Sequence, residues 1–115
     1  MSDAIRVASE GQIAEDEAIV VDAATAGTDD DIAVFFSEGR YWALTNLCTH
    51  GQASLADGWV EAGEVECPLH GARFSLSTGA ALCLPVSVPV ATHRVEVRDG
   101  GIWLCPEVPV EGAAL

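Results

Sequence analysis

The sequence predicts a single all-β domain over residues 1–107, an antiparallel barrel or sandwich, followed by a loose tail over 108–115. Three observations predict this class. Short apolar or alternating runs recur, Gly-containing turn signals separate them, and no stretch has the apolar period of a helix. Many short strands separated by turns are typical of barrels and sandwiches. The expected strands are, in order, residues 5–7, 18–21, 32–36, 41–45, 58–61, 64–66, 73–76, 94–98 and 102–105.

The N-terminal strands are expected to be joined by polar segments. Residues 5–7 alternate and residues 18–21 form a compact apolar run, with an acidic connection between them. The segment 25–31 contains a glycine and three consecutive aspartates, which predict a loop. Residues 32–36 and 41–45 are rich in β-branched and aromatic side chains around a Gly-containing turn, and so predict a hairpin.

The C-terminal strands follow the same logic. Residues 58–61 and 64–66 flank the turn Ala62-Gly63, and residues 73–76 alternate. Residues 94–98 and 102–105 flank a turn of one aspartate and two glycines, which predicts a final hairpin.

The apolar stretch 80–90 is different, because Pro85 and Pro89 argue against a central strand. It is expected to be a covering loop with edge-strand character. Leu82, Leu84 and Pro85 either cover a functional site or simply pack on the core, and the sequence leaves both readings open.

Charge excludes some partners and favours others. The chain has 18 acidic residues against five arginines and no lysine, a net charge of −13. Nucleic-acid binding needs basic groups that displace counterions, so a nucleic-acid partner is not expected, nor is an anionic membrane surface. The acidity favours partners with positive docking patches, or else serves solubility.

No targeting segment or long apolar span is evident, so we expect a cytoplasmic protein with no membrane association. In that compartment cysteines indicate metal binding or catalysis more often than disulfides.

Two short loops carry the chemistry. Cys48 and His50 form a C-x-H pattern, sixteen residues follow, and Cys67 and His70 form C-x-x-H. One thiol and one imidazole in each loop indicate an iron–sulfur centre in which two histidines replace two cysteines on one iron. The simplest closure places Cys48 and Cys67 on an inner iron and His50 and His70 on an outer iron.

A zinc site is the alternative, because two cysteines and two histidines are a legitimate zinc set. Zinc loops usually pair like with like, whereas each loop here is mixed. Gly51 and Gly71 follow the histidines and either admit backbone N–H groups near cluster sulfurs or are ordinary turn glycines.

At these residues the chain resembles Rieske-type [2Fe–2S] proteins, and most closely the ferredoxin components of bacterial aromatic-ring-hydroxylating dioxygenase systems of the naphthalene-dioxygenase type. The similar run extends from Asn46 to Pro85 and defines the expected cluster-binding part, 46–85. The resemblance implies a Rieske fold with one [2Fe–2S] cluster held by Cys48, His50, Cys67 and His70. It implies a carrier of one electron from a flavin-containing ferredoxin reductase to a terminal oxygenase of aromatic hydrocarbon catabolism.

Departures from the high-potential Rieske proteins of bc-type complexes predict a low potential. The extra cysteines that form a disulfide there correspond to Ala53 and Leu69, and the hydrogen-bonding serine and tyrosine correspond to Ala72 and Phe74. Fewer donors toward the sulfurs stabilise the reduced state less.

Three further residues and three tryptophans need a role. Cys83 and Cys105 are expected to be buried thiols, with a disulfide between them as the alternative, and His93 is expected to be a surface or partly buried residue and no ligand. The tryptophans are expected in the core, although Trp59 between the ligand loops also suits a docking face.

With one spare histidine, the chain lacks the two histidines and carboxylate of an oxygenase iron, so it is expected not to be an enzyme. The alternative function is a small Rieske-like subunit of an assimilatory nitrite reductase; a zinc-stabilised binding module is a third.

Overall fold

A computed structural model of the chain describes residues 4–47, 54–68, 73–82 and 89–106. Within them the all-β prediction is confirmed. The strands are β1 (Ile5–Ser9), β2 (Glu17–Val21), β3 (Ile32–Ser37), β4 (Arg40–Thr45), β5 (Trp59–Glu61), β6 (Glu64–Glu66), β7 (Arg73–Ser75), β8 (Thr92–Arg98) and β9 (Gly101–Cys105). The predicted tail lies outside the described residues.

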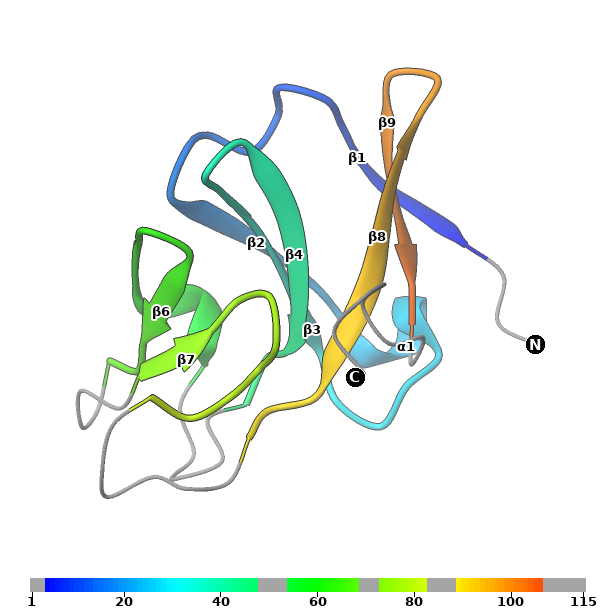
Figure 1. The fold of residues 1–115 in the computed structure, drawn as a ribbon. Coiled ribbons are helices and arrows are strands. Elements are labelled where there is room, and N and C mark those ends of the chain that lie inside the picture. The colour runs from blue at the N-terminus through cyan, green and yellow to red at the C-terminus, as the bar shows by residue number, and fades with distance from the viewer. Residues whose placement is uncertain (1–3, 48–53, 69–72, 83–88, 107–115) are drawn as a thin grey trace.

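The strands form two antiparallel sheets. Six pair in the order β1-β9-β8-β4-β3-β2, and three pair in the order β5-β6-β7. Figure 1 shows the larger sheet curling on itself, with the small sheet beside β2, β3 and β4 and the N-terminus on the far side. Strands β5 and β6 of the small sheet lie between the two predicted ligand loops in sequence, and β7 follows the second loop.

Three hairpin turns set the register of the neighbouring strands. The central residues of each have positive φ: Glu38 and Gly39, Ala62 and Gly63, and Asp99 and Gly100. This is the type I′ conformation, whose twist matches that of paired strands. Both predicted hairpins, and the predicted turn at Ala62-Gly63 between two strands, are therefore confirmed.

Strand β3 separates two hydrophobic cores. Its residues Ala33 and Phe35 pack in one core with Leu55, Val65 and the rest of the small sheet. Its Ile32 and Val34 face the opposite way, into a core shared with β1 and β9. Burial on both faces explains why this strand is a continuous apolar run and does not alternate.

Two short helical turns were not predicted. The first, α1 (Ala23–Ala26), begins after Asp22, whose carboxylate accepts a hydrogen bond from the Thr25 backbone N–H, and it ends at Gly27 in the left-handed region. The hydrogen bonds from Thr25 lower the pKa of the Asp22 carboxyl. The second, η1 (Leu55–Asp57), is a 3-10 turn before β5. Neither is long enough to show an apolar period.

Of the two positions that the sequence left open for Trp59, the core and an exposed face, the structure shows the exposed one, with 72% of the residue accessible. Trp42 and Trp103 are half-buried. Trp59 is on β5, at the edge of the three-stranded sheet and on the face away from the core. Among the described segments, no helix is long and apolar enough to cross a membrane.

Candidate metal centre

Of the four predicted ligands, the structure describes Cys67. It directly follows β6, is 1% exposed, and packs in the core that contains Val65 and Phe74. Its thiol is free of any disulfide. The chain therefore presents a reduced sulfur at a strand end, in apolar surroundings that exclude water.

The other three predicted ligands, Cys48, His50 and His70, lie outside the described residues, as do Gly51 and Gly71. The structure does describe the residues on either side of their segments. These flanking residues show how the chain holds the ends of both loops.

Asn46 closes the base of the first loop segment. Its side-chain amide donates to the Ser54 hydroxyl oxygen at 2.7 Å, and its side-chain oxygen accepts from the Ala56 backbone N–H at 2.8 Å. Its own backbone N–H donates to the Asp31 carbonyl oxygen at 2.7 Å. One side chain thus joins the end of β4 to the start of η1, across residues 47–54. Sequence reasoning gave Asn46 no role; the signal was a polar amide placed where an apolar strand ends.

The small sheet closes the base of the second loop segment. Glu66 lies opposite Arg73 in the β6–β7 pair, which brings Cys67 and Arg73 to the same end of the sheet. The Arg73 carbonyl oxygen accepts from the Leu82 backbone N–H at 2.7 Å, and Ala81 bridges to Phe74.

The predicted edge-strand character of residues 80–90 is thus seen at Ala81. Leu82 is exposed, and Leu84 and Pro85 lie outside the described residues, so the covering role of this run stays a prediction.

Two glycines allow the strands at this end to pack closely. A Cβ built on Gly58 would overlap the Glu66 carbonyl oxygen, and one on Gly79 would overlap the Val90 carbonyl oxygen. Gly79 also needs its positive φ, and the Val90 N–H donates to its carbonyl oxygen at 2.8 Å. Gly58 and Gly79 therefore hold η1 against β6 and the 77–80 turn against β8.

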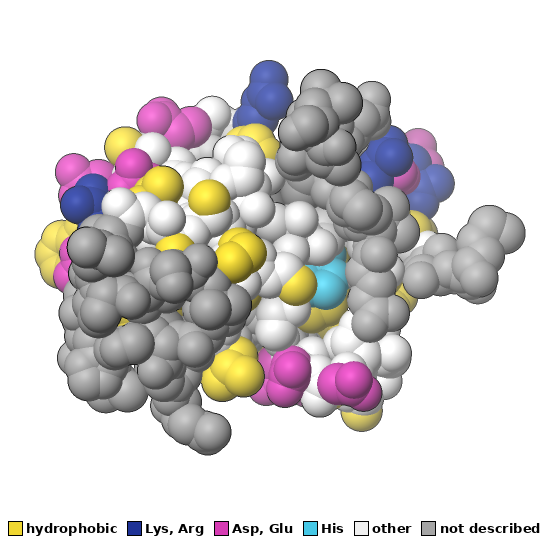
Figure 2. Space-filling model, turned by 60° about the horizontal axis from the view of Figure 1, so that its bottom comes forward, with side chains coloured by type: hydrophobic (Ala, Val, Ile, Leu, Met, Phe, Trp, Pro, Cys, Tyr) yellow, Lys and Arg dark blue, Asp and Glu magenta, His cyan; other side chains and the backbone are white. Residues whose placement is uncertain are grey.

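His93 is buried, 4% exposed, so the expectation of a surface or partly buried side chain is wrong. It pairs with Ala43 across β4 and β8, and its Nε2 lies 2.9 Å from the Thr45 hydroxyl oxygen. The histidine colour occupies only a small spot on the face in Figure 2. The long-range β4–β8 register buries the ring, and no local pattern around residue 93 signals that pairing.

The His93→Ala variant is expected to keep an iron–sulfur centre and lose stability. Removing the ring leaves a cavity and leaves the Thr45 hydroxyl without its partner, a loss of about 1–3 kcal/mol in the free energy of unfolding. Urea unfolding followed by circular dichroism measures the stability, and electron paramagnetic resonance (EPR) of the reduced protein measures the centre. Thr45→Val removes the same hydrogen bond without the cavity and should cost less. Loss of the centre in His93→Ala would show that the ligand set is wrong.

Cys105 is a buried, free thiol, as expected, and it forms no disulfide with Cys83, which lies outside the described residues. Burial raises the pKa of the Cys105 thiol, and the nearby Glu96 carboxylate adds to the rise. Cys105 therefore stays protonated and is a core side chain.

The family model described as "Rieske [2Fe-2S] domain" matches residues 3–94. Two curated relatives are named as ferredoxin components. The 3-phenylpropionate/cinnamic acid dioxygenase ferredoxin subunit of Photorhabdus laumondii is 48% identical over 75 residues, 64% of this chain and 71% of the relative. The ferredoxin component of the naphthalene 1,2-dioxygenase/salicylate 5-hydroxylase systems of a Ralstonia species is 43% identical over 74 residues, with the same coverages of 64% and 71%.

The fold also resembles a solved structure. A chain in the complex of reduced oxygenase and oxidized ferredoxin in carbazole 1,9a-dioxygenase superposes with a TM-score of 0.86 and 28% sequence identity, covering 96% of this chain and all of that chain. The relatives are electron-transfer components rather than catalytic subunits, which confirms the resemblance drawn from the two loops. The chain belongs to the Rieske [2Fe–2S] domain family.

Proposed function

We propose that this protein is a one-electron carrier in an aromatic-ring-hydroxylating oxygenase system. It accepts an electron from a flavin-containing reductase and delivers it to a terminal non-haem iron oxygenase, which hydroxylates or dihydroxylates an aromatic compound. The observation that carries this proposal is the family match together with two relatives named as dioxygenase ferredoxin components. The carbazole complex, in which a ferredoxin is bound to its oxygenase, supports the oxygenase as one partner.

We infer that Cys48 and Cys67 hold one iron and that His50 and His70 hold the other. The described residues fit this assignment at Cys67, a free, buried thiol at a strand end. A [2Fe–2S] centre with two histidine ligands supplies a reversible one-electron site whose potential lies above that of all-cysteine plant-type centres. The chain's own contribution is to keep the Cys67 sulfur away from water and, through Asn46 and the β6–β7 pair, to hold both loop bases together.

The proposed functional unit is the domain 1–107, with its cluster-binding part at 46–85, acting in the cytoplasm. A subunit of an assimilatory nitrite reductase is less well supported, because relatives at 48% and 43% identity are both named ferredoxin components. A zinc-stabilised binding module would be colourless and redox-inactive.

An EPR spectrum of the dithionite-reduced protein tests this function. A rhombic signal with an average g value below that of all-cysteine clusters would support mixed histidine and cysteine ligation. A colourless, EPR-silent protein that contains zinc would reject electron transfer.

The reduction potential is expected to lie near or below about −100 mV, toward the lower end of the Rieske range. Phe74, which takes the place of a hydrogen-bonding tyrosine, is fully buried in the apolar core and has no hydroxyl to donate. A spectroelectrochemical titration measures the potential. A value above zero would show that other groups donate to the centre.

A further inference from the structure

We propose that the exposed side of the β5–β6 hairpin, formed by Trp59, Glu61 and Glu66, binds an arginine or lysine side chain on the surface of the electron-transfer partner. We call this surface the indole–carboxylate face. The proposal rests on the proposed function and names the chemistry of the docking contact, a basic protein surface.

The hairpin separates an apolar side from a charged one. Val60 and Val65 are buried and point into the core, whereas Trp59, Glu61 and Glu66 are exposed on the opposite side. Among the described strands, β5 is an edge strand that pairs only with β6. An indole that is 72% exposed contributes little to the core, and most of its surface remains available to a partner.

The surface beside Trp59 is hollowed. A depression of about 220 Å³ is lined by Trp59, Glu61, Glu64, Glu66 and Arg73. Arg73 already pairs with Glu64 at 2.8 Å, so Glu61 and Glu66 are the carboxylates next to the indole that this ion pair does not use. A guanidinium or ammonium group that enters the depression meets the indole, the carboxylates of Glu61 and Glu66, and the Arg73–Glu64 ion pair, so the lining has a net negative charge.

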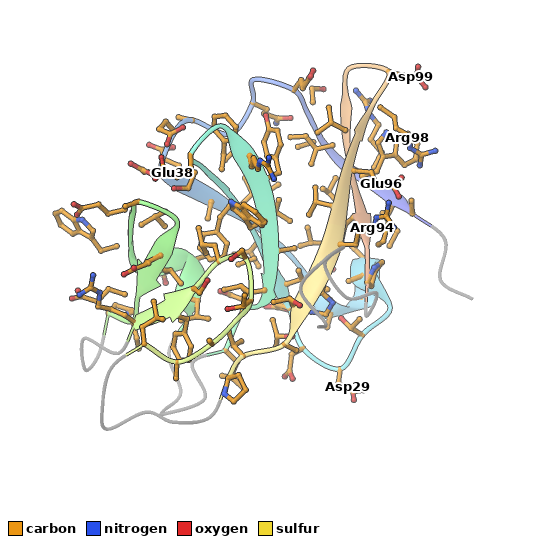
Figure 3. The ribbon with its side chains drawn as sticks, viewed as in Figure 1. Asp29, Glu38, Arg94, Glu96, Arg98 and Asp99 are labelled. Carbon is orange, nitrogen blue, oxygen red and sulfur yellow. The ribbon has the colours of Figure 1, made fainter. Side chains whose placement is uncertain are left out.

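The opposite end of the molecule shows the same arrangement with its cation present. On the β8–β9 hairpin, Glu96 lies directly across from Trp103. The Arg98 guanidinium lies 4.7 Å from the centroid of the Trp103 ring, and its Nε is 3.4 Å from Glu96. Figure 3 shows Glu96 and Arg98 on the same side of β8. A cross-strand Glu–Trp pair in this chain therefore holds an arginine by an ion pair and a cation–π contact.

The β5–β6 hairpin repeats this Glu–Trp pair, but the arginine beside it, Arg73 across from Glu66, forms its ion pair with Glu64. Glu66 lies directly across from Trp59, as Glu96 does from Trp103. Arg98 lies two residues after Glu96. The residues two positions before and after Glu66 are Glu64 and Pro68, and neither is basic. Within the described part of the chain, the cation–π contact found is that of Arg98 with Trp103. The partner's arginine or lysine would complete the pair at Trp59.

Charge is distributed so that a basic surface is drawn to this end. Arg94 and Arg98 lie along β8, across the molecule from β6 and β7 (Figure 3), and Arg6 is on the neighbouring pair β1–β9. The small sheet exposes Glu61 and Glu66, and its one arginine, Arg73, is paired with Glu64. Glu66 is the last residue of β6 and immediately precedes Cys67, so a partner bound at this face docks beside a predicted ligand.

Electron transfer to mitochondrial cytochrome c, a lysine-rich acceptor, tests the face. The reduced protein gives one electron, and the ferric haem of cytochrome c takes it to become ferrous, so the absorbance change in a stopped-flow instrument reports the second-order rate constant. Glu61→Gln/Glu66→Gln and Trp59→Leu, which keeps an apolar side chain without a π face, should each lower the rate constant about fivefold at low ionic strength. The difference from wild type should shrink in 0.5 M salt, an ionic strength at which exposed charges are screened within about 5 Å.

Glu10→Gln/Asp99→Asn is the matched control, because it removes the same two charges from the exposed β8–β9 tip and the adjoining Glu10. It should retain the wild-type rate constant. Equal slowing in both double variants would mean that only the net charge of the protein affects the rate constant. An unchanged rate constant in Trp59→Leu would mean that no cation–π contact forms at Trp59. Either result overturns the proposal. The EPR spectrum of each variant distinguishes failure of the docking face from failure of the proposed function. A normal Rieske signal with unchanged rates refutes the face alone, whereas a wild type without that signal refutes the proposed function, and the face with it.

Discussion

The Cys67→Ser variant is expected to contain little iron and to lose the Rieske EPR signal. Its hydroxyl is a harder and weaker ligand for iron–sulfur iron than a thiolate, and Cys67 supplies one of only two proposed thiolates. The site offers no replacement from water, because the Cys67 side chain is 1% exposed inside the core. Iron analysis and EPR of the purified variant measure the loss.

Cys105→Ser is the control for this substitution. It makes the same chemical change at another buried, free thiol, on β9 and away from the small sheet. It should keep its iron and its signal. Circular dichroism of both variants, and of Cys67→Ala, distinguishes loss of the centre from loss of the fold. A folded Cys67→Ser protein with a full Rieske signal would show that Cys67 is only a core residue.

The Gly79→Ala variant is expected to lose about 3 kcal/mol or more of the free energy of unfolding. Two costs combine: about 1–2 kcal/mol for placing a Cβ at positive φ, and about 1–3 kcal/mol for crowding in a packed region. The φ of Gly79 is 74°, and the new methyl group would overlap the Val90 carbonyl oxygen. The change also disturbs the Val90 N–H bond to Gly79 and the Gly79 N–H bond to Ser75. The midpoint of urea unfolding measures the loss.

Gly39→Ala separates the two costs. Gly39 has nearly the same φ, 73°, but a Cβ there meets nothing within 4 Å. It should therefore lose only about 1–2 kcal/mol, the conformational part. Equal losses in the two variants would mean that the contact with Val90 relaxes freely and does not hold the 77–80 turn against β8.

Local signals were sufficient to predict the hairpins. Ala62-Gly63 and Asp99-Gly100 each lie between alternating or apolar runs, and both turns adopt positive φ values, which Asp-Gly favours and which glycine adopts readily. The two loops predicted to hold ligands stood out because ligand chemistry fixes residue types at short spacing, which one sequence displays directly. The family match over residues 3–94 confirms that reading at the level of the family.

Long-range pairing was not predictable in the same way. The contact of β1 with β9 joins the two ends of the domain, and that of β4 with β8 buries His93. No residue near either strand encodes which distant strand it meets. The role of Asn46 and the exposure of Trp59 depend on the same three-dimensional neighbours, so they too required the structure.

Strand β3 has a consequence for how the molecule opens. Both of its faces are covered by core and both of its edges are paired, with β2 and with β4. Its amide protons have no route to solvent short of global unfolding, so β3 should form the slowest-exchanging core of the protein. Strand β5 is short, paired on one edge and exposed on one face, and its amides can exchange through local opening. The chain thus combines a slowly exchanging strand, β3, in the core that contains the Cys67 thiol with a locally opening strand, β5, where a partner would first make contact.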